Sequence, residues 1–151
     1  MTADGNGSLG HGYYFEDLAV GMEASYAKTL TNDDVLAFAK LSGDVNPVHL
    51  SDAFASGTIF KQRIAHGFLT ASLLSTVLGT KLPGPGCIYL SQSLKFRAPV
   101  YIGDEVVARA KITSLDPEKG RAVLACACAV NSKTVLDGEA VMMVSRRSKP
   151  A

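Results

Sequence analysis

The sequence has little of what marks several large classes of protein. Its 151 residues contain three cysteines, no tryptophan and 19% charged residues, with a formal net charge of +1. An odd cysteine count without framework spacing argues against a secreted disulfide scaffold. Cys87, Cys126 and Cys128 lack Cys or His partners at metal-ligand spacing, so we expect small, reduced core residues. The balanced charge gives no basic face for nucleic acid.

A signal peptide and a transmembrane run are also missing. Residues 1–12 are polar and glycine-rich, without the basic and apolar regions of a signal peptide. The most apolar stretch, 68–82, is too short to cross a bilayer. We therefore expect a cytoplasmic protein with no membrane partner, made of one domain over 13–146. Residues 1–12 and 147–151 are predicted to be flexible tails.

The first half of the chain has helical patterns after one strand-like segment, 21–30. Thr31-Asn-Asp-Asp34 is a variant of the capping box, and apolar residues follow it at helical spacing. This helix is expected to end near Gly43, because Gly43 and the Asn46-Pro47 step both disfavour its continuation. A short helical turn is expected over 51–56.

Residues 66–81 differ from these helices because their apolar and small side chains cover the whole helical circumference. That pattern predicts a helix buried on all sides. After the turn at 82–86 the period changes to two, which predicts strands near 88–96, 106–112, 121–131 and 134–144. The fold class is therefore α+β, with one buried helix lying on a curved antiparallel sheet.

The segment Asp44-Val-Asn-Pro-Val-His49 combines an acid and a histidine across a stiff turn. Histidine titrates near neutrality, and a carboxylate can share one water molecule with it, so the pair suits acid/base catalysis. Each residue also has a purely structural interpretation. Asp44 can be a solvated residue after a helix, Asn46-Pro47 a common turn, and His49 a surface side chain.

A second segment, Ile64-Ala-His66-Gly67, stands at the start of the apolar helix. The first amides of a helix have no partner within it and lie at the positive end of its dipole. Because Gly67 has no side chain, its amide can approach a developing oxyanion closely. The structural alternative is that Gly67 allows close helix packing and that His66 is a core or loop residue.

Together the two motifs resemble the MaoC-like hydratase family. The pattern D-x-N-P-x-H, followed about seventeen residues later by A-H-G, is typical of that family, and 89–100 and 103–106 resemble its following strand and turn. The resemblance runs from about Tyr14 to Val144 and is strongest to the short (R)-specific enoyl-CoA hydratases. It implies the hot-dog fold, a curved sheet wrapped around the long helix, and a homodimer whose sheets pair edge to edge.

The resemblance also implies an activity, namely hydration of trans-2-enoyl-CoA to (R)-3-hydroxyacyl-CoA and its reversal, in fatty acid metabolism or polyhydroxyalkanoate precursor supply. Asp44 and His49 would hold the reacting water, with Asp44 the preferred base, and the Gly67 amide would polarise the thioester carbonyl. Because the two titrations are coupled, those roles can be reversed. No metal or cofactor is implied. The residues it assigns to substrate binding are Asn46, His66, Phe68 and Ser75.

Two other functions fit a hot-dog fold. An acyl-CoA thioesterase often carries a catalytic acid on the long helix, but 67–80 contain no Asp or Glu. A non-catalytic acyl-thioester-binding subunit would be free to lose Asp44 or His49, and both are present. The sequence leaves the acyl chain length open, and also whether coenzyme A or acyl carrier protein carries the acyl group.

Overall fold

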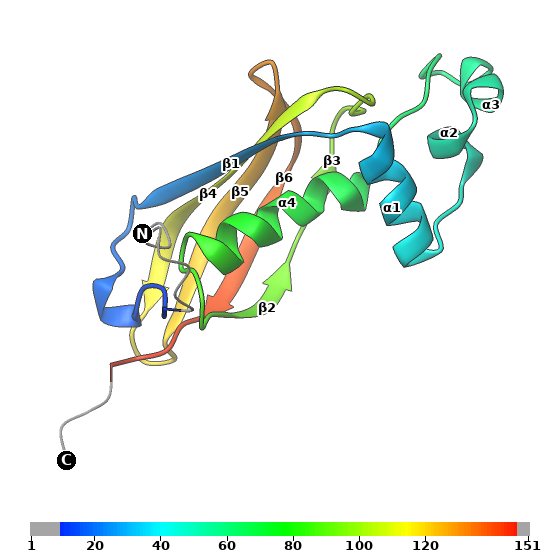
Figure 1. Ribbon diagram of the computed structural model, residues 1–151. Helices are drawn as coiled ribbons and strands as arrows, with labels where there is room; N and C mark the ends of the chain where they lie inside the picture. The colour runs from blue at the N-terminus through cyan, green and yellow to red at the C-terminus, as the bar shows by residue number, and fades with distance from the viewer. Residues whose placement is uncertain (1–9, 148–151) are drawn as a thin grey trace.

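A six-stranded antiparallel sheet with one long helix on its face forms most of the chain (Figure 1). The computed structural model describes residues 10–147. The strands lie in the order β1-β4-β5-β6-β2, and β3 also pairs with β6. Their bounds are β1 (Glu23–Thr29), β2 (Ile88–Gln92), β3 (Lys95–Phe96), β4 (Glu105–Asp116), β5 (Arg121–Val130) and β6 (Lys133–Met143). The predicted α+β class is confirmed.

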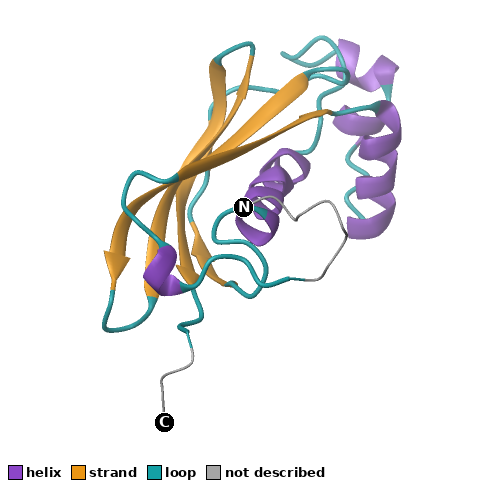
Figure 2. Ribbon diagram, turned by 60° about the vertical axis from the view of Figure 1, so that its left-hand side comes forward, coloured by secondary structure: helices purple, strands orange, loops and turns teal. Residues whose placement is uncertain are grey.

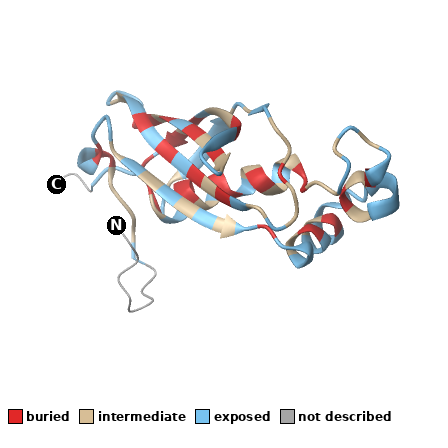
Figure 3. Ribbon diagram, turned by 90° about the horizontal axis from the view of Figure 1, so that it is seen from above, coloured by how far each residue is buried: buried red, intermediate tan, exposed pale blue. Residues whose placement is uncertain are grey.

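Strands β4 and β5 at the centre of the sheet turn alternate side chains toward the helix. Every second residue is buried from Val106 to Ile112 and from Ala122 to Cys128, as the banding of the strands in Figure 3 shows. On β4 the buried face is the apolar face that the sequence predicted for 106–112. On β5 it includes Cys126 and Cys128, which are free thiols, and burial raises their pKa to about 11 and about 12. Small core residues were expected here, and the structure confirms them. The buried residues of the two strands are Val106, Ala108, Ala110, Ile112, Ala122, Leu124, Cys126 and Cys128.

The single strand expected over 88–96 is divided into β2 and β3. Its register against β6 shifts between Tyr89 and Ser91, and the chain leaves the ladder before Lys95. At that point the Ser93 carbonyl occupies the place where a Cβ of Gly138 would stand. Because Gly138 has no side chain, the segment between β2 and β3 can cross close over β6. An uninterrupted strand paired with β6 would not need this glycine.

Helix α4 (Gly67–Thr80) lies against the sheet (Figure 2), but it is not buried on all sides as predicted. Leu73, Leu74, Val77 and Leu78 are buried toward the strands. On the other side, one stripe of four residues at helical spacing is exposed, and we call it the α4 stripe. Small and apolar residues can be buried at little cost, but their presence does not show which of them are covered by other parts of the same chain. The α4 stripe consists of Phe68, Ser72, Ser75 and Gly79.

Three shorter helices gather beyond the N-terminal end of α4: α1 (Asn32–Ser42), α2 (Pro47–Leu50) and α3 (Asp52–Ser56) (Figures 1 and 2). The capping box of α1 is confirmed, since Thr31 Oγ1 accepts from Asp34 N–H at 3.2 Å and Asp34 Oδ2 from Thr31 N–H at 2.9 Å. Gly43 ends α1 in the left-handed conformation at φ 81°. Helix α2, one turn long, was not predicted.

Both ends of the described chain contact the rest of the domain. Gly12 N–H donates to the Pro85 carbonyl at 2.8 Å, and Arg147 Nη2 lies 2.5 Å from Asp17 Oδ1. Arg146 pairs with Glu16 at 3.8 Å. The backbone hydrogen bond attaches Gly12 to the domain, and the ion pair attaches Arg147. Residues 1–9 and 148–151 of the predicted tails lie outside the described chain. No helix within 10–147 combines the length and apolar character needed to cross a membrane.

Candidate active site

A tight turn between α1 and α2 carries the acid and the histidine of the first motif. Asp44 Oδ1 accepts from Asn46 N–H at 3.2 Å, and Asn46 Oδ1 accepts from Val48 N–H, also at 3.2 Å. Asn46 therefore caps α2, and Pro47 occupies the first helical position, where its missing N–H costs nothing. The one turn of α2 then directs His49 inward, leaving Asp44 exposed and His49 only 8% exposed.

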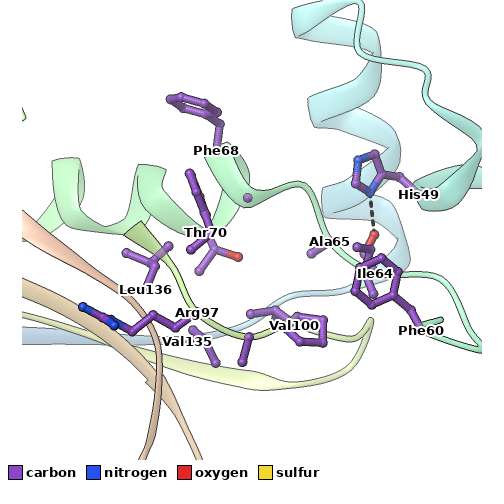
Figure 4. Close-up of a pocket in the computed structure, with 14 residues that line it drawn as sticks. His49, Phe60, Ile64, Ala65, Phe68, Thr70, Arg97, Val100, Val135 and Leu136 are labelled. Carbon is purple, nitrogen blue, oxygen red and sulfur yellow. Dashed lines mark hydrogen bonds between the residues drawn. The ribbon is translucent and has the colours of Figure 1, made fainter. Parts of the chain in front are cut away.

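The hydrogen bonds of His49 define which of its nitrogens is available for chemistry. Nδ1 lies 2.8 Å from the Ile64 carbonyl oxygen (Figure 4). A carbonyl can only accept, so Nδ1 carries the proton and, in the neutral ring, Nε2 has a free lone pair. Burial lowers the pKa of His49, helped by His66, while the bond to Ile64 and the charge of Asp44 oppose the shift. A lowered pKa favours the neutral, proton-accepting ring.

His66 lies directly behind His49. Its ring is 1% exposed, and Nε2 lies 2.9 Å from the Asp44 carbonyl oxygen. The two histidine rings are stacked, with centroids 3.9 Å apart and planes inclined by 29°. Phe38 of α1 packs against His66 at 4.8 Å. The second motif thus contacts the first through a buried imidazole.

A carboxylate oxygen of Asp44 and one nitrogen each of His49 and His66 lie within 4.8 Å of one another. This trio has the composition of a metal site. However, imidazole lone pairs lie in the ring planes, and those of two stacked rings do not converge on one point. One nitrogen of each ring is also engaged by a carbonyl. A separation of that size does suit one water molecule that hydrogen-bonds to both Asp44 and His49.

Gly67 is the first residue of α4, so its N–H has no partner within the helix. The ring of Phe96 lies where a side chain at Gly67 would start, with Cε1 2.6 Å from an ideal Cβ position. The lack of a side chain therefore serves close packing with Phe96, the structural alternative considered above. It also leaves the amide beside the cavity.

A cavity of about 490 Å³ opens next to His49 and the start of α4. That volume is typical of small-molecule sites. Figure 4 shows its lining side chains coming from α2, the segment before α4, α4 itself, the segment after β3, and β6. The lining residues are mostly apolar, with His49, Thr70 and Arg97 as the polar side chains: His49, Phe60, Ile64, Ala65, Gly67, Phe68, Thr70, Phe96, Arg97, Ala98, Pro99, Val100, Val135 and Leu136.

The predicted site residues take different positions relative to this cavity. His49, Gly67 and Phe68 line it, and Asp44 adjoins His49. Asn46 serves the turn, and His66 is enclosed behind the wall. Ser75 is on the α4 stripe, two turns and about 12 Å of helical rise beyond Gly67.

The sequence analysis missed Thr70 and Phe96 as lining residues. Thr70 had a usable signal, because it stands one turn after Gly67 and so shares its face of the helix. Phe96 had no signal in the sequence, because it reaches Gly67 only where the segment between β2 and β3 crosses over β6.

Comparison with known proteins extends this description. Residues 18–131 match the family model described as a MaoC like domain. A 3-hydroxybutyryl-CoA dehydratase of Methylorubrum extorquens is 52% identical over 136 residues, covering 90% of this chain and 87% of that protein. An (R)-specific enoyl-CoA hydratase of Rhodospirillum rubrum is 52% identical over 135 residues, covering 89% of this chain and 94% of that protein.

Solved structures show the same fold. An unliganded R-hydratase from Pseudomonas aeruginosa superposes with a TM-score of 0.85 at 40% identity, covering 93% of this chain and 92% of that one. An (R)-hydratase of Aeromonas caviae, involved in PHA biosynthesis, gives a TM-score of 0.84 at 45% identity, covering 85% of this chain and 98% of that one. These neighbours confirm the predicted hot-dog fold.

Proposed function

The chain belongs to the MaoC-like domain family, and on that premise we propose that it hydrates trans-2-enoyl thioesters to (R)-3-hydroxyacyl thioesters, and catalyses the reverse dehydration. One observation carries the proposal. Asp44 and His49 lie within one-water distance, and His49 lines an apolar cavity that the first residue of α4 also borders. The relatives named for this chemistry match most of the chain at about half identity.

The proposed first step is addition of water to C3. Nε2 of neutral His49 accepts a proton from the water, while the Asp44 carboxylate accepts a hydrogen bond from its other hydrogen. The new C–O bond forms as the C2–C3 π electrons move toward the thioester carbonyl. The Gly67 N–H donates to the oxygen that gains charge, as an oxyanion-hole donor does.

The second step returns the proton to carbon. The His49 imidazolium delivers its Nε2 proton to C2, which completes the addition and restores neutral His49. The oxygen added to C3 and the hydrogen added to C2 approach the same face of the double bond, so the addition is syn. This assignment reverses the preference for Asp44 as base, because the Nδ1–H bond and the lowered pKa of His49 leave Nε2 as an acceptor.

Coenzyme A is the carrier we propose, with acyl carrier protein as the alternative. Of the cations near the cavity, Arg63 is engaged by the His49 carbonyl and by Asn32. Arg97 lines the cavity, but its Nε lies 2.8 Å from Asp137 Oδ2. Lys61 and Lys95 are exposed nearby in the sequence, and these two with Arg97 are the candidates for phosphate contacts. The three free thiols suit the cytoplasm, which we propose as its location.

An assay with crotonyl-CoA tests the function. We expect loss of absorbance at the enone band without release of free thiol, and an (R)-3-hydroxybutyryl product by chiral analysis. Thiol release would instead indicate the thioesterase. Neither change, with the protein folded, would indicate a non-catalytic subunit, and an (S) product would contradict the proposed geometry. The reaction needs no metal or cofactor, so extensive chelation should leave the rate unchanged.

A further inference from the structure

We infer that His66 is a positioning residue that holds Asp44 and His49 in register with the Gly67 amide, and not a substrate contact. The inference rests on the function proposed above. It starts from burial, because His66 is 1% exposed and does not line the cavity. The ring nevertheless contacts both segments that carry the acid/base pair.

The first contact fixes the loop that carries the acid. Nε2–H of His66 donates to the Asp44 backbone oxygen over 2.9 Å. The other bonds of this turn, from Asp44 N–H to Ser42 and from Asn46 N–H to Asp44, are local and exposed. They shape the turn but do not attach it to α4. The His66 bond spans 22 residues and therefore sets where Asp44 stands relative to that helix.

The second contact fixes the orientation of His49. Its ring is held at one edge by the Ile64 carbonyl and on one face by the His66 ring, 3.9 Å away between centroids. Phe38 supports His66 at 4.8 Å. A ring held at an edge and a face has little freedom to rotate about its χ angles, so its free Nε2 keeps one direction.

The third connection is covalent. His66 is the N-cap residue of α4, directly before Gly67. A shift of the imidazole therefore shifts the amide proposed to receive the thioester oxygen. Three reacting groups from α2, α4 and the turn before α2 thus share one buried support. Catalytic geometry is sensitive to such supports, because a misplacement of about 1 Å can cost about 100-fold in rate.

Thr70, one helical turn after His66, carries a second unsatisfied buried polar atom. Among the described residues, His66 Nδ1 and Thr70 Oγ1 are the two buried side-chain polar atoms without a hydrogen-bond partner. Ser72 and Thr80 on the same helix bond back to the Leu69 and Thr76 carbonyls, as helical hydroxyls commonly do. Thr70 does not, and it stands four residues after His66 on the same face. Donation from Thr70 Oγ–H to His66 Nδ1 would satisfy both atoms and lock the Nε2–H tautomer.

Two substitutions at His66 separate the roles of its ring. His66→Phe keeps the stacking and removes the bond to Asp44, whereas His66→Gln keeps an N–H donor and removes the ring. We expect His66→Phe to lower kcat about 10- to 100-fold with KM changed less than about threefold, as misplaced groups do. His66→Gln should recover part of that loss. His11→Gln, outside the site, is the matched control.

The contrary results are distinct. An increase in KM at unchanged kcat would make His66 a substrate contact. A His66→Phe enzyme that is folded and within twofold of the normal kcat would overturn the positioning role. A folded His66→Gln enzyme no better than His66→Phe would show that the bond to Asp44 positions nothing.

Long-range ¹H–¹⁵N spectra of the histidines test the arrangement without turnover. In the neutral rings we expect Nε2–H for His66 and Nδ1–H for His49. Thr70→Val should shift the His66 Nδ1 resonance, and Thr70→Ser should restore it. The opposite tautomer at His66, or an Nδ1 that ignores Thr70→Val, would contradict the inference. If the wild type hydrates no enoyl thioester, the proposed function fails, while these spectra still decide the arrangement.

Discussion

At the residue scale, the site depends on which histidine nitrogen is already occupied. The Ile64 carbonyl holds the Nδ1 proton of His49, and burial lowers the pKa of the ring, so Nε2 is left as the group that accepts a proton. Asp44 is exposed and uses Oδ1 to support its own turn. The two residues therefore differ in environment, which suits different roles around one water molecule.

Replacing either member of the pair should remove catalysis but not the fold. We expect Asp44→Asn and His49→Gln each to reduce kcat by about 10²–10⁴-fold, the range for general acid/base groups. KM should change less, and the double variant should be little worse than the worse single one, because both act on one water. Asp33→Asn and His11→Gln are matched controls. Steady-state kinetics would refute the pairing if Asp44→Asn kept near-normal kcat.

The lowered pKa of His49 predicts the acid side of the pH profile. A base must be unprotonated, so kcat/KM should be constant near pH 7 and fall as the pH drops through a value below the ordinary 6.5. Because the Asp44 charge raises the pKa of His49, Asp44→Asn should move the remaining inflection further down. A rate that grows on acidification would assign His49 as a donor.

The same shift has a consequence for folding. The unfolded chain binds a proton at His49 near pH 6.5, whereas the folded chain binds it only at lower pH. The folded state should therefore lose stability as the pH falls from 6.5 through the lowered pKa, and none of this loss should occur above 6.5. Denaturant titrations of wild type and His49→Gln between pH 5 and 8 would measure the difference.

At the element scale, α4 has three separate roles. Its buried side packs on the sheet, its first residues border the cavity, and the α4 stripe remains exposed. Phe68 takes part in two of them, since it is 66% exposed, lines the cavity and packs against Phe96 with ring centroids 5.9 Å apart. Both rings of this aromatic pair line the cavity and are more than half exposed.

We therefore expect Phe68 to influence chain-length preference. Phe68→Ala should change the ratio of kcat/KM between C4 and longer enoyl-CoA substrates, by no more than the roughly 1–3 kcal/mol that one methylene contributes in an apolar pocket. Phe54→Ala, at a half-exposed aromatic on α3 outside the cavity, should leave the ratio unchanged. An equal loss for all lengths would assign Phe68 to folding.

At the scale of the whole molecule, one edge of the sheet is apolar and uncovered. Ile88, Tyr89 and Leu90 of β2 are 51%, 39% and 41% exposed, and Phe96 of β3 is 52% exposed. An exposed apolar edge strand invites pairing with another chain. The α4 stripe is also uncovered. A second copy that pairs edge to edge would cover β2, so we propose a homodimer.

Light scattering should give twice the 15.9 kDa of one chain at micromolar concentration. Ile88→Lys on β2 should produce monomers, because a buried charge opposes edge pairing. Val20→Lys, an exposed position near the opposite edge, should not. A wild-type monomer would contradict the proposal.

The sequence by itself determined the features that depend on near neighbours. The capping box of α1, its end at Gly43, the alternating face of β4 and the turn around Asn46 each follow from residues within about four positions. The motif of Asp44, His49 and Gly67 was also evident from the sequence, because the order and spacing of these residues along the chain are what identify it. These patterns held because backbone conformation and local hydrogen bonds decide them.

Only the tertiary structure decided how distant segments meet. It placed His66 against His49, laid Phe96 over Gly67 and left the α4 stripe uncovered, where composition alone predicted a fully buried helix. It also selected the tautomer of His49, and so its proposed role, through a carbonyl fifteen residues away. Such contacts depend on which faces the folded chain brings together, and no periodicity within one segment encodes them.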